Sequence, residues 1–209
     1  MFNENDCHSI LAKYPAGADL DSDDEDEIDD ATRTLHIIDK LELLLSAVFP
    51  TNKNDTEPSI MFHDDLSRHN ILVSEDGELT AVLDWECVSA LPLWKACYYP
   101  LYLQEKSRHS KPNIRTYHRE ADGEPYDIYW IHLWEYETTI LRDIFIEEMK
   151  KLEPGWVEVF NKSQIQRDLD FAAHNCDHEF MARDIKEWIE DITAAKCNCK
   201  SLCDRIYEV

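Results

Sequence analysis

Glycine is scarce in this chain: there are four in 209 residues, and only Gly17 precedes residue 65. Positive charge is also scarce, because 21 Lys and Arg stand against 44 Asp and Glu, a formal net charge of -23. Such a field repels nucleic acid phosphates and anionic membrane surfaces, so we expect neither as a partner. A cationic small molecule would be attracted, although the plainer reason for the acidity is solubility.

Long apolar runs are missing too. No stretch approaches the roughly 20 apolar residues of a membrane-spanning helix, and the first residues lack the basic and apolar regions of a secretion signal. We therefore expect an intracellular, cytoplasmic protein whose seven cysteines are reduced thiols. The segment 196–209 forms a tail with Cys197, Cys199 and Cys203. A soft-metal site there is the alternative, but the tail has no paired CxxC and no nearby His.

The chain has enough apolar residues for a core, with 44% hydrophobic and 11% aromatic residues. Residues 1–30 show no periodic apolar pattern, and nine carboxylates lie between Asp19 and Asp30. Because like charges at this density repel one another, we predict a flexible acidic leader over 1–30. A metal-binding acidic loop is the alternative, but the segment lacks the glycine and ligand spacing of an EF-hand.

The residues after the leader predict helices around one hairpin. Apolar residues recur at three- and four-residue steps from residue 31 to Val48, which is typical of an amphipathic helix. Two short apolar runs, 71–73 and 79–83, flank an Asp-Gly turn and predict a β-hairpin. Beyond Pro92 the pattern is helical, with helices expected over 126–149, 165–180 and 185–192. The sequence thus predicts a mainly α (α+β) lobe over 31–195.

The residues that carry chemistry flank the hairpin. Phosphoryl transfer to a hydroxyl needs a carboxylate that accepts the proton and two oxygen ligands for metal ions. Asp65 and Asn70 lie five positions apart before the hairpin, and Asp84 directly follows it. Because the two strands are antiparallel neighbours, Asn70 and Asp84 should meet at the same end of the hairpin. The structural alternative makes Asp65 and Asn70 turn residues and Asp84 a helix cap.

These motifs resemble a known family. His63-Asp64-Asp65-Leu66, Asn70-Ile71-Leu72-Val73 and Leu83-Asp84-Trp85-Glu86 are similar to the loop and the later motif of the aminoglycoside phosphotransferase family, above all its large fungal branch of phosphotransferase enzymes, which has a protein-kinase-like fold. The resemblance is strongest over residues 61–97. Trp85-Glu86 stands where protein kinases have Phe-Gly, which argues against a protein kinase.

The resemblance implies a role for each matching position. Asp65 would be the catalytic base, His63 would brace the loop, and Asn70 and Asp84 would bind Mg²⁺ and, through it, ATP. Asp64 departs from the family, which often has glycine there. Its carboxylate either raises the pKa of Asp65 or faces solvent, and the sequence leaves both open.

An upstream nucleotide lobe is the part that the pattern lacks. Kinase-like enzymes place a Gly-rich loop and a strand Lys before the catalytic loop, and neither precedes Asp65 here. We therefore expect a kinase-like C-terminal lobe with the N-terminal nucleotide lobe absent. Its uncovered cleft face would favour self-association.

Two functions follow from this expectation. The chain is either a truncated phosphotransferase for small-molecule hydroxyl acceptors, inactive alone, or a non-catalytic binding or scaffold module. A cationic acceptor could be bound by Asp127, Glu135, Glu137 and Asp143, unless these residues form the wet face of a core helix.

Overall fold

The computed structural model describes residues 4–14, 20–50, 58–104, 106–195 and 200–207. It divides into two compact units, one of residues 1–55 and 164–206 and the other of residues 56–163 with 207–209. The fold is mainly helical with small antiparallel sheets, as predicted. However, the predicted lobe 31–195 is divided between the two units. The reason is that the helix before residue 50 packs against helices after residue 163.

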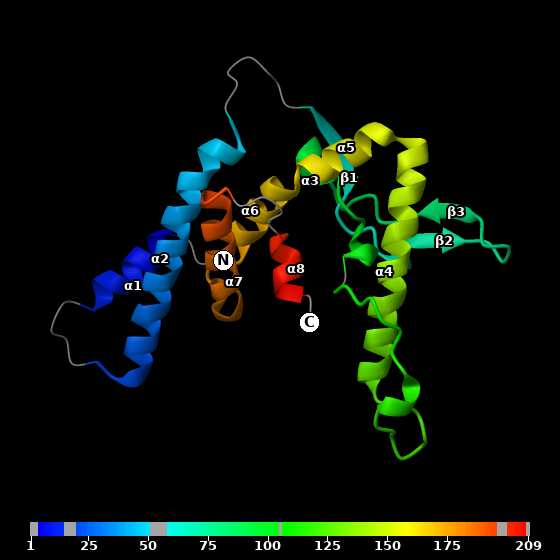
Figure 1. The fold of residues 1–209 in the computed structure, drawn as a ribbon, viewed down its shortest axis with the longest axis horizontal. Helices are drawn as coiled ribbons and strands as arrows, with labels where there is room; N and C mark the ends of the chain where they lie inside the picture. Colours follow the sequence, from blue (N-terminus) through cyan, green and yellow to red (C-terminus); the bar gives the residue numbers. More distant parts are fainter. Residues whose placement is uncertain (1–3, 15–19, 51–57, 105, 196–199, 208–209) are drawn as a thin grey trace. The chain divides into compact units, whose positions relative to one another are not determined.

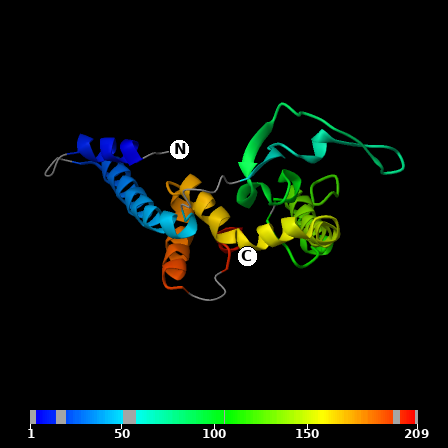
Figure 2. The ribbon, with the colours of Figure 1, turned by 90° about the horizontal axis from the view of Figure 1, so that it is seen from above.

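The first unit is helical in its described residues. Its elements are α1 (Glu4–Lys13), α2 (Ser22–Val48), α6 (Gln164–His174), α7 (Glu179–Thr193) and α8 (Leu202–Tyr207). The helix α2 runs beside α1 and α7 (Figure 1; Figure 2). Trp188 and Ile185 of α7 are fully buried against Ile37 of α2, and Ala172 of α6 and Leu202 of α8 complete this core. The helix predicted over 165–180 is interrupted at 175–178, where the amide of His178 donates to the carbonyl of Asn175 in a turn.

The helix α2 begins nine residues before the predicted boundary at residue 31. Asp21 caps it: its carboxylate accepts the amides of Asp23 and Asp24 at 3.0 Å each, and the carboxylate of Asp24 accepts the amide of Asp21. Negative charge in the first turn is favoured by the helix dipole, so the acidic run starts a helix. The described residues of the predicted leader thus lie largely in α1 and α2, and the flexibility of this segment stays a prediction. Residues 1–3 and 15–19 of that leader lie outside the described residues.

The second unit carries two antiparallel strand pairs. The predicted hairpin is confirmed as β2 (Ile71–Val73) and β3 (Leu79–Val82). A pair that was not predicted, β1 (Ser59–His63) with β4 (Val88–Pro92), encloses it in the sequence. The prediction of helix directly after Pro92 holds for α3 (Leu93–Ala96). The nested strands bring the segments on either side of the hairpin together.

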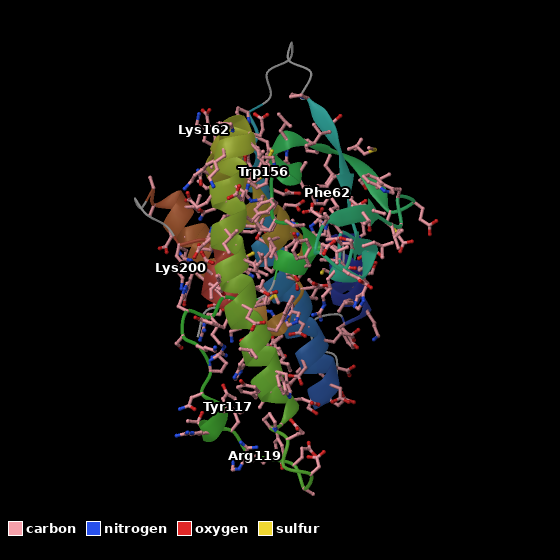
Figure 3. The ribbon with its side chains drawn as sticks, turned by 90° about the vertical axis from the view of Figure 1, so that its right-hand side faces the viewer. Phe62, Tyr117, Arg119, Trp156, Lys162 and Lys200 are labelled. Atoms are coloured by element: carbon pink, nitrogen blue, oxygen red, sulfur yellow. The ribbon has the colours of Figure 1, made fainter. Side chains whose placement is uncertain are left out.

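The longest helix of this unit is α4 (Asp127–Leu152), followed by α5 (Pro154–Lys162). Arg142 of α4 donates from Nε to the carbonyl of Leu103 at the end of the 3-10 helix η2 (Leu101–Leu103). Trp156 of α5 lies toward one end of α4, and Tyr117, just after the 3-10 helix η3 (Ile114–Thr116), lies at the other (Figure 3). The helix therefore fixes the loops that follow the strands.

Two expectations about the whole chain can be checked on the described residues. None of the described helices combines the length and the apolar character that crossing a membrane requires. Five cysteines of the described residues form no disulfide there, and their reduced state stays a prediction: Cys7, Cys87, Cys97, Cys176 and Cys203. Cys197 and Cys199 of the predicted tail lie outside the described residues.

Candidate active site at the base of the hairpin

The loop between β1 and β2 is fastened by Asn70. This side chain is 6% exposed and donates from Nδ2 to the carbonyl of Asp65 at 2.8 Å and to Oδ2 of Asp65 at 3.1 Å. Two backbone hydrogen bonds close the turn between them. The amide of Ser67 donates to the carbonyl of Asp65, and the amide of Asn70 donates to the carbonyl of Ser67. Asn70 therefore fixes both the backbone and the carboxylate of Asp65.

The backbone of the hairpin brings Asp84 to the same place. The amide of Leu83 donates to the carbonyl of Asn70 at 2.8 Å. Asn70 and Leu83 are therefore opposite each other at the base of the hairpin, and Asp84 is the next residue in the chain. Asp84 has φ 57°, a left-handed conformation that L residues other than Asn, Asp and Gly adopt rarely. The amide of Cys87 donates to its carbonyl at 3.0 Å. The predicted juxtaposition of Asn70 and Asp84 at one end of the hairpin is present.

His63 connects the end of β1 with the residue before Asp84. Its Nε2 lies 2.8 Å from the carbonyl oxygen of Leu83, and a carbonyl only accepts, so Nε2 carries the proton. The ring meets Trp85 edge-on, with the centroids 5.3 Å apart. Its Nδ1 is buried and has no hydrogen-bond partner among the described residues. His63 is therefore a clasp between β1 and the turn that presents Asp84.

Asp64 is used structurally. Its Oδ2 accepts a hydrogen bond of 2.6 Å from the hydroxyl of Ser89 in β4, and its amide donates to the carbonyl of Cys87. The carboxylate of Asp64 thus joins the residue after β1 to the start of β4. Sequence reasoning missed Ser89, because nothing local links positions 64 and 89 before the strand pairing is known.

The base of the hairpin is strongly acidic. Desolvation raises the pKa of the Cys87 thiol, and the negative charges of Glu86, Asp65, Asp84 and Asp64 raise it further. These carboxylates therefore act on one point from both sides of the hairpin. A field of this sign favours cations and opposes bare phosphates.

The donor atoms suit Mg²⁺. Because Nδ2 of Asn70 is committed to Asp65, its Oδ1 remains as an acceptor. The carboxylate of Asp84 is exposed and has no hydrogen-bond partner among the described residues. The described residues contain no cluster of three His, Cys, Asp or Glu side chains that could hold a metal ion by themselves. Mg²⁺ prefers oxygen ligands and keeps several waters, so one carboxylate and one amide oxygen fit it.

The loop is also held from outside. The guanidinium carbon of Arg68, in the 3-10 helix η1 (Arg68–Asn70), lies 4.3 Å from the centroid of the Trp134 ring on α4. The amide of Tyr102 donates to the carbonyl of Leu66 at 3.4 Å. Sequence reasoning singled out neither Arg68 nor Trp134, because a contact across 66 positions leaves no local pattern.

The acidic residues proposed for a cationic acceptor do not act alike. Glu135 is buried and accepts a 2.8 Å bond from Nε of Arg108, so its charge is already paired. Asp127, Glu137 and Asp143 are exposed. Exposure agrees with the wet face of a core helix, and Glu135 is better described as an anchor for the 106–108 loop.

Comparison with known proteins supports the family resemblance. Residues 9–94 match the model of the phosphotransferase enzyme family. The predicted family resemblance is confirmed. The match begins well before the predicted limit at residue 31 and includes His63, Asp65, Asn70 and Asp84.

One curated relative is similar to a shorter stretch. A protein described as clavilactone A biosynthesis cluster protein Y, from Ampulloclitocybe clavipes, is 46% identical over 55 residues. The alignment covers 24% of this chain and 14% of that protein. No solved structure gives a significant match.

Proposed function

We propose that this phosphotransferase-family chain provides the base and the metal ligands of an ATP-dependent enzyme that phosphorylates a small-molecule hydroxyl. The observation that carries the proposal is the double hydrogen bond from Asn70 to Asp65, next to the backbone bond that brings Asp84 to Asn70. Asn70 and Asp65 are thereby held together and the backbone brings Asp84 next to Asn70, which supports a site with the oxygen chemistry that phosphoryl transfer uses. Such an enzyme works inside the cell, where ATP and Mg²⁺ are available.

Each residue has one task in the proposed reaction. Oδ2 of Asp65 is held by Asn70, so the other oxygen takes the proton of the acceptor hydroxyl. The hydroxyl oxygen forms a bond to the γ-phosphorus of ATP while the bond to the β-phosphate oxygen breaks, and ADP leaves. Asn70 Oδ1 and the Asp84 carboxylate would hold Mg²⁺, which offsets phosphate charge when bound. His63 positions Asp84 through Leu83.

The nucleotide must also be covered. Positioning of the β- and γ-phosphates supplies much of the rate in this chemistry, and the 209 residues include no Gly-rich loop with a pairing Lys. We therefore propose that the chain is inactive alone, and that active protein combines it with a lobe from outside these residues. A cationic hydroxyl compound is the acceptor class that the acidic site favours.

A non-catalytic binding module is the second candidate. The observation that favours it is apolar exposure around the hairpin: Val73, Leu79 and Trp85 are 60%, 65% and 54% exposed. Exposed apolar groups on both strands of the hairpin and on the turn after it suit a protein partner or a second copy of the chain.

Binding of Mn²⁺ in place of Mg²⁺ tests the catalytic proposal. Water-proton relaxation of Mn²⁺ with ATP should show a complex with the chain that Asp84→Asn weakens by roughly tenfold, since a charged ligand is lost. Asp76→Asn, at the exposed hairpin tip, removes the same charge and should leave the complex unchanged. Equal Mn²⁺ affinity in all three proteins would exclude the metal site and leave the binding module.

A further inference from the structure

The first unit contains a pocket between α1, α2 and the turn that precedes α7. The residues that line it come from all three segments: Ile10, Glu27, Asp30, Ala31, Thr34 and Asp177. Its empty volume, counted with the open mouth, is about 360 Å³. Pockets that bind small molecules begin at roughly 300 Å³, so this one has room for a small ligand.

The hydroxyl of Thr34 is the unusual group in this pocket. Thr34 is 3% exposed, and its hydroxyl has no hydrogen-bond partner among the described residues. Thr139 and Thr193, which are also helical, each donate to the carbonyl four residues earlier, at 2.8 and 2.7 Å. The hydroxyl of Thr138 lacks a partner too, but it is enclosed, whereas that of Thr34 is open to the pocket. Because an unpaired hydroxyl in a buried position is costly, a ligand in the pocket would supply the missing partner.

Two carboxylates of the pocket keep a further acceptor oxygen. Oε2 of Glu27 accepts from Nζ of Lys13 and from the hydroxyl of Tyr14. Oδ1 of Asp30 accepts a 2.6 Å bond from Arg33. The second oxygen of each carboxylate receives no hydrogen bond from the residues that the structure describes. The pocket is therefore rich in hydrogen-bond acceptors.

Asp177 adds a third carboxylate from the turn before α7. Burial raises the pKa of the Cys7 thiol on α1, and the negative charges of Asp6 and Asp177 raise it further. Asp177 therefore acts on α1 at short range. Three carboxylates in the pocket wall exceed the two cations, Lys13 and Arg33, that pair with them. The excess negative charge favours a positively charged ligand.

The lining also indicates the kind of cation. The described residues contain no cluster of three metal-binding side chains, so an organic cation fits better than a metal ion. A quaternary ammonium is recognised by aromatic faces, and no aromatic ring lines this pocket. A primary ammonium carries three N–H donors, which match the unused acceptors. Ile10 and Ala31 provide apolar wall for its alkyl group.

We propose that this pocket binds a small primary alkylammonium ion, whose N–H groups are accepted by Thr34 and by the neighbouring carboxylates. The pocket belongs to the first unit, whereas Asp65, Asn70 and Asp84 belong to the second. The inference therefore does not depend on the proposed phosphoryl transfer.

n-Propylammonium is the probe, titrated into the ¹⁵N-labelled chain at constant ionic strength. The backbone amides of Ala31 and Thr34 should shift, with a Kd of about 1 mM. Thr34→Val, which removes the hydroxyl and keeps the shape, should weaken binding by roughly tenfold. Thr34→Ser keeps the hydroxyl and should bind nearly as the wild type does. Thr32→Val, an exposed change on the same helix, is the matched control and should have no effect.

A second comparison tests the charge. Asp30→Asn should weaken binding several-fold, because it neutralises a carboxylate of the pocket wall. Asp29→Asn removes the same charge from the chain at an exposed position next to it and should change binding little. Tetramethylammonium, which has no N–H donor, should bind the wild type at least roughly tenfold more weakly than n-propylammonium.

Three outcomes would overturn the inference. Equal binding of the two cations to the wild type would show only the general attraction of an acidic surface, and this comparison decides the question even if Thr34→Val is unstable. Unchanged affinity in a folded Thr34→Val would remove the hydroxyl from the site. Loss of n-propylammonium binding in Asp84→Asn would assign the cation to the proposed active site instead.

Discussion

At the residue scale, Asp84 joins a side chain that we propose as a metal ligand to a backbone conformation that suits glycine. Its φ of 57° lies in the left-handed region, where a residue with a Cβ costs roughly 1 kcal/mol or more. Aspartate tolerates this region better than most side chains, because its short polar group can form local hydrogen bonds. The conformation alone therefore does not distinguish a structural Asp84 from one that binds a metal.

Replacing Asp84 by glycine separates these two properties. Asp84→Gly should leave the free energy of unfolding unchanged or raise it by up to about 1 kcal/mol, because the strain is relieved, while Mn²⁺ binding is lost. Chemical denaturation measures the first effect and water-proton relaxation the second. Asp76→Gly, at a position without positive φ, should destabilise slightly. A large loss of stability in Asp84→Gly would mean that the carboxylate is structural.

Asp168 gives a second residue-scale prediction, about pH. This side chain is 3% exposed, its Oδ2 has no partner among the described residues, and burial raises its pKa to about 6 against the partly compensating hydrogen bond from the Leu202 amide. Because the folded pKa exceeds the ordinary value of 3.8, protonation favours the folded state. Stability associated with this group is present in full below pH 3.8 and is lost as the pH rises through about 6.

The variant Asp168→Asn removes the charge. At pH 7 it should raise the free energy of unfolding by as much as about 3 kcal/mol, and the gain should shrink to nothing near pH 4. Denaturation curves of wild type and variant at both pH values measure the difference. Asp26→Asn, an exposed change on α2, serves as the control and should show little pH-dependent gain. A destabilised Asp168→Asn at pH 7 would show that the ionised form is needed.

Residue-level prediction from the sequence worked where the chemistry was local or joined by a hairpin. Asp65, Asn70 and Asp84 could be placed together because an Asp-Gly turn fixes which ends meet. The clasp from Asp64 to Ser89 and the stacking of Arg68 on Trp134 depend on contacts across 25 and 66 positions. No local pattern carries such information, so these partners emerge only with the fold.

At the scale of elements, the acidic start of α2 was not predicted as helix, because the helix prediction relied on the periodicity of apolar residues. Between Ser22 and Asp30 only Ile28 is apolar, so no stripe is visible. The start of the helix is set by the cap at Asp21 and by the interaction of early carboxylates with the helix dipole. Lys13, the last residue of α1, and Tyr14, which follows it, both donate side-chain hydrogen bonds to the carboxylate of Glu27.

Removing the cap should therefore weaken the start of α2. Asp21→Ala should lower the free energy of unfolding by about 1 kcal/mol and speed amide exchange over residues 23–27, because two amides lose their acceptor. Hydrogen exchange read by NMR measures both the protection and its loss. Asp29→Ala, an exposed change within the helix, should have a smaller effect. Fast exchange of residues 23–27 in the wild type would instead support the flexible leader.

The strand pair β1 and β4 shows the same limit for sheets. The hairpin could be predicted from its Asp-Gly turn, in which Gly77 has a φ of 83°. The run Ser59–His63 has no turn beside it, and its partner begins 25 residues after it ends. Pairing at that distance follows from the hairpin nested between them, which a strand-by-strand assignment does not consider.

At the scale of the whole molecule, the family match and the compact units divide the chain differently. The match ends at residue 94, whereas the second unit continues through α4 and α5 to residue 163. The segment from His63 to Asp84 thus lies in a unit whose later helices fall outside the match. Those helices supply Trp134, which contacts Arg68, and Arg142, which holds the carbonyl of Leu103.

The last prediction is that this chain alone does not turn over ATP. Asp65, Asn70 and Asp84 supply the proposed base and metal ligands, but the 209 residues hold no Gly-rich loop or pairing Lys to keep the β- and γ-phosphates in line. Binding of ATP should then require Mg²⁺ and be weak, near millimolar or roughly 4 kcal/mol. Calorimetry with Mg-ATP and an assay of released phosphate test both parts, with Asp84→Asn as the comparison. Micromolar binding that this change abolishes, together with phosphate release, would show a self-sufficient site in which other residues of the chain cover the nucleotide.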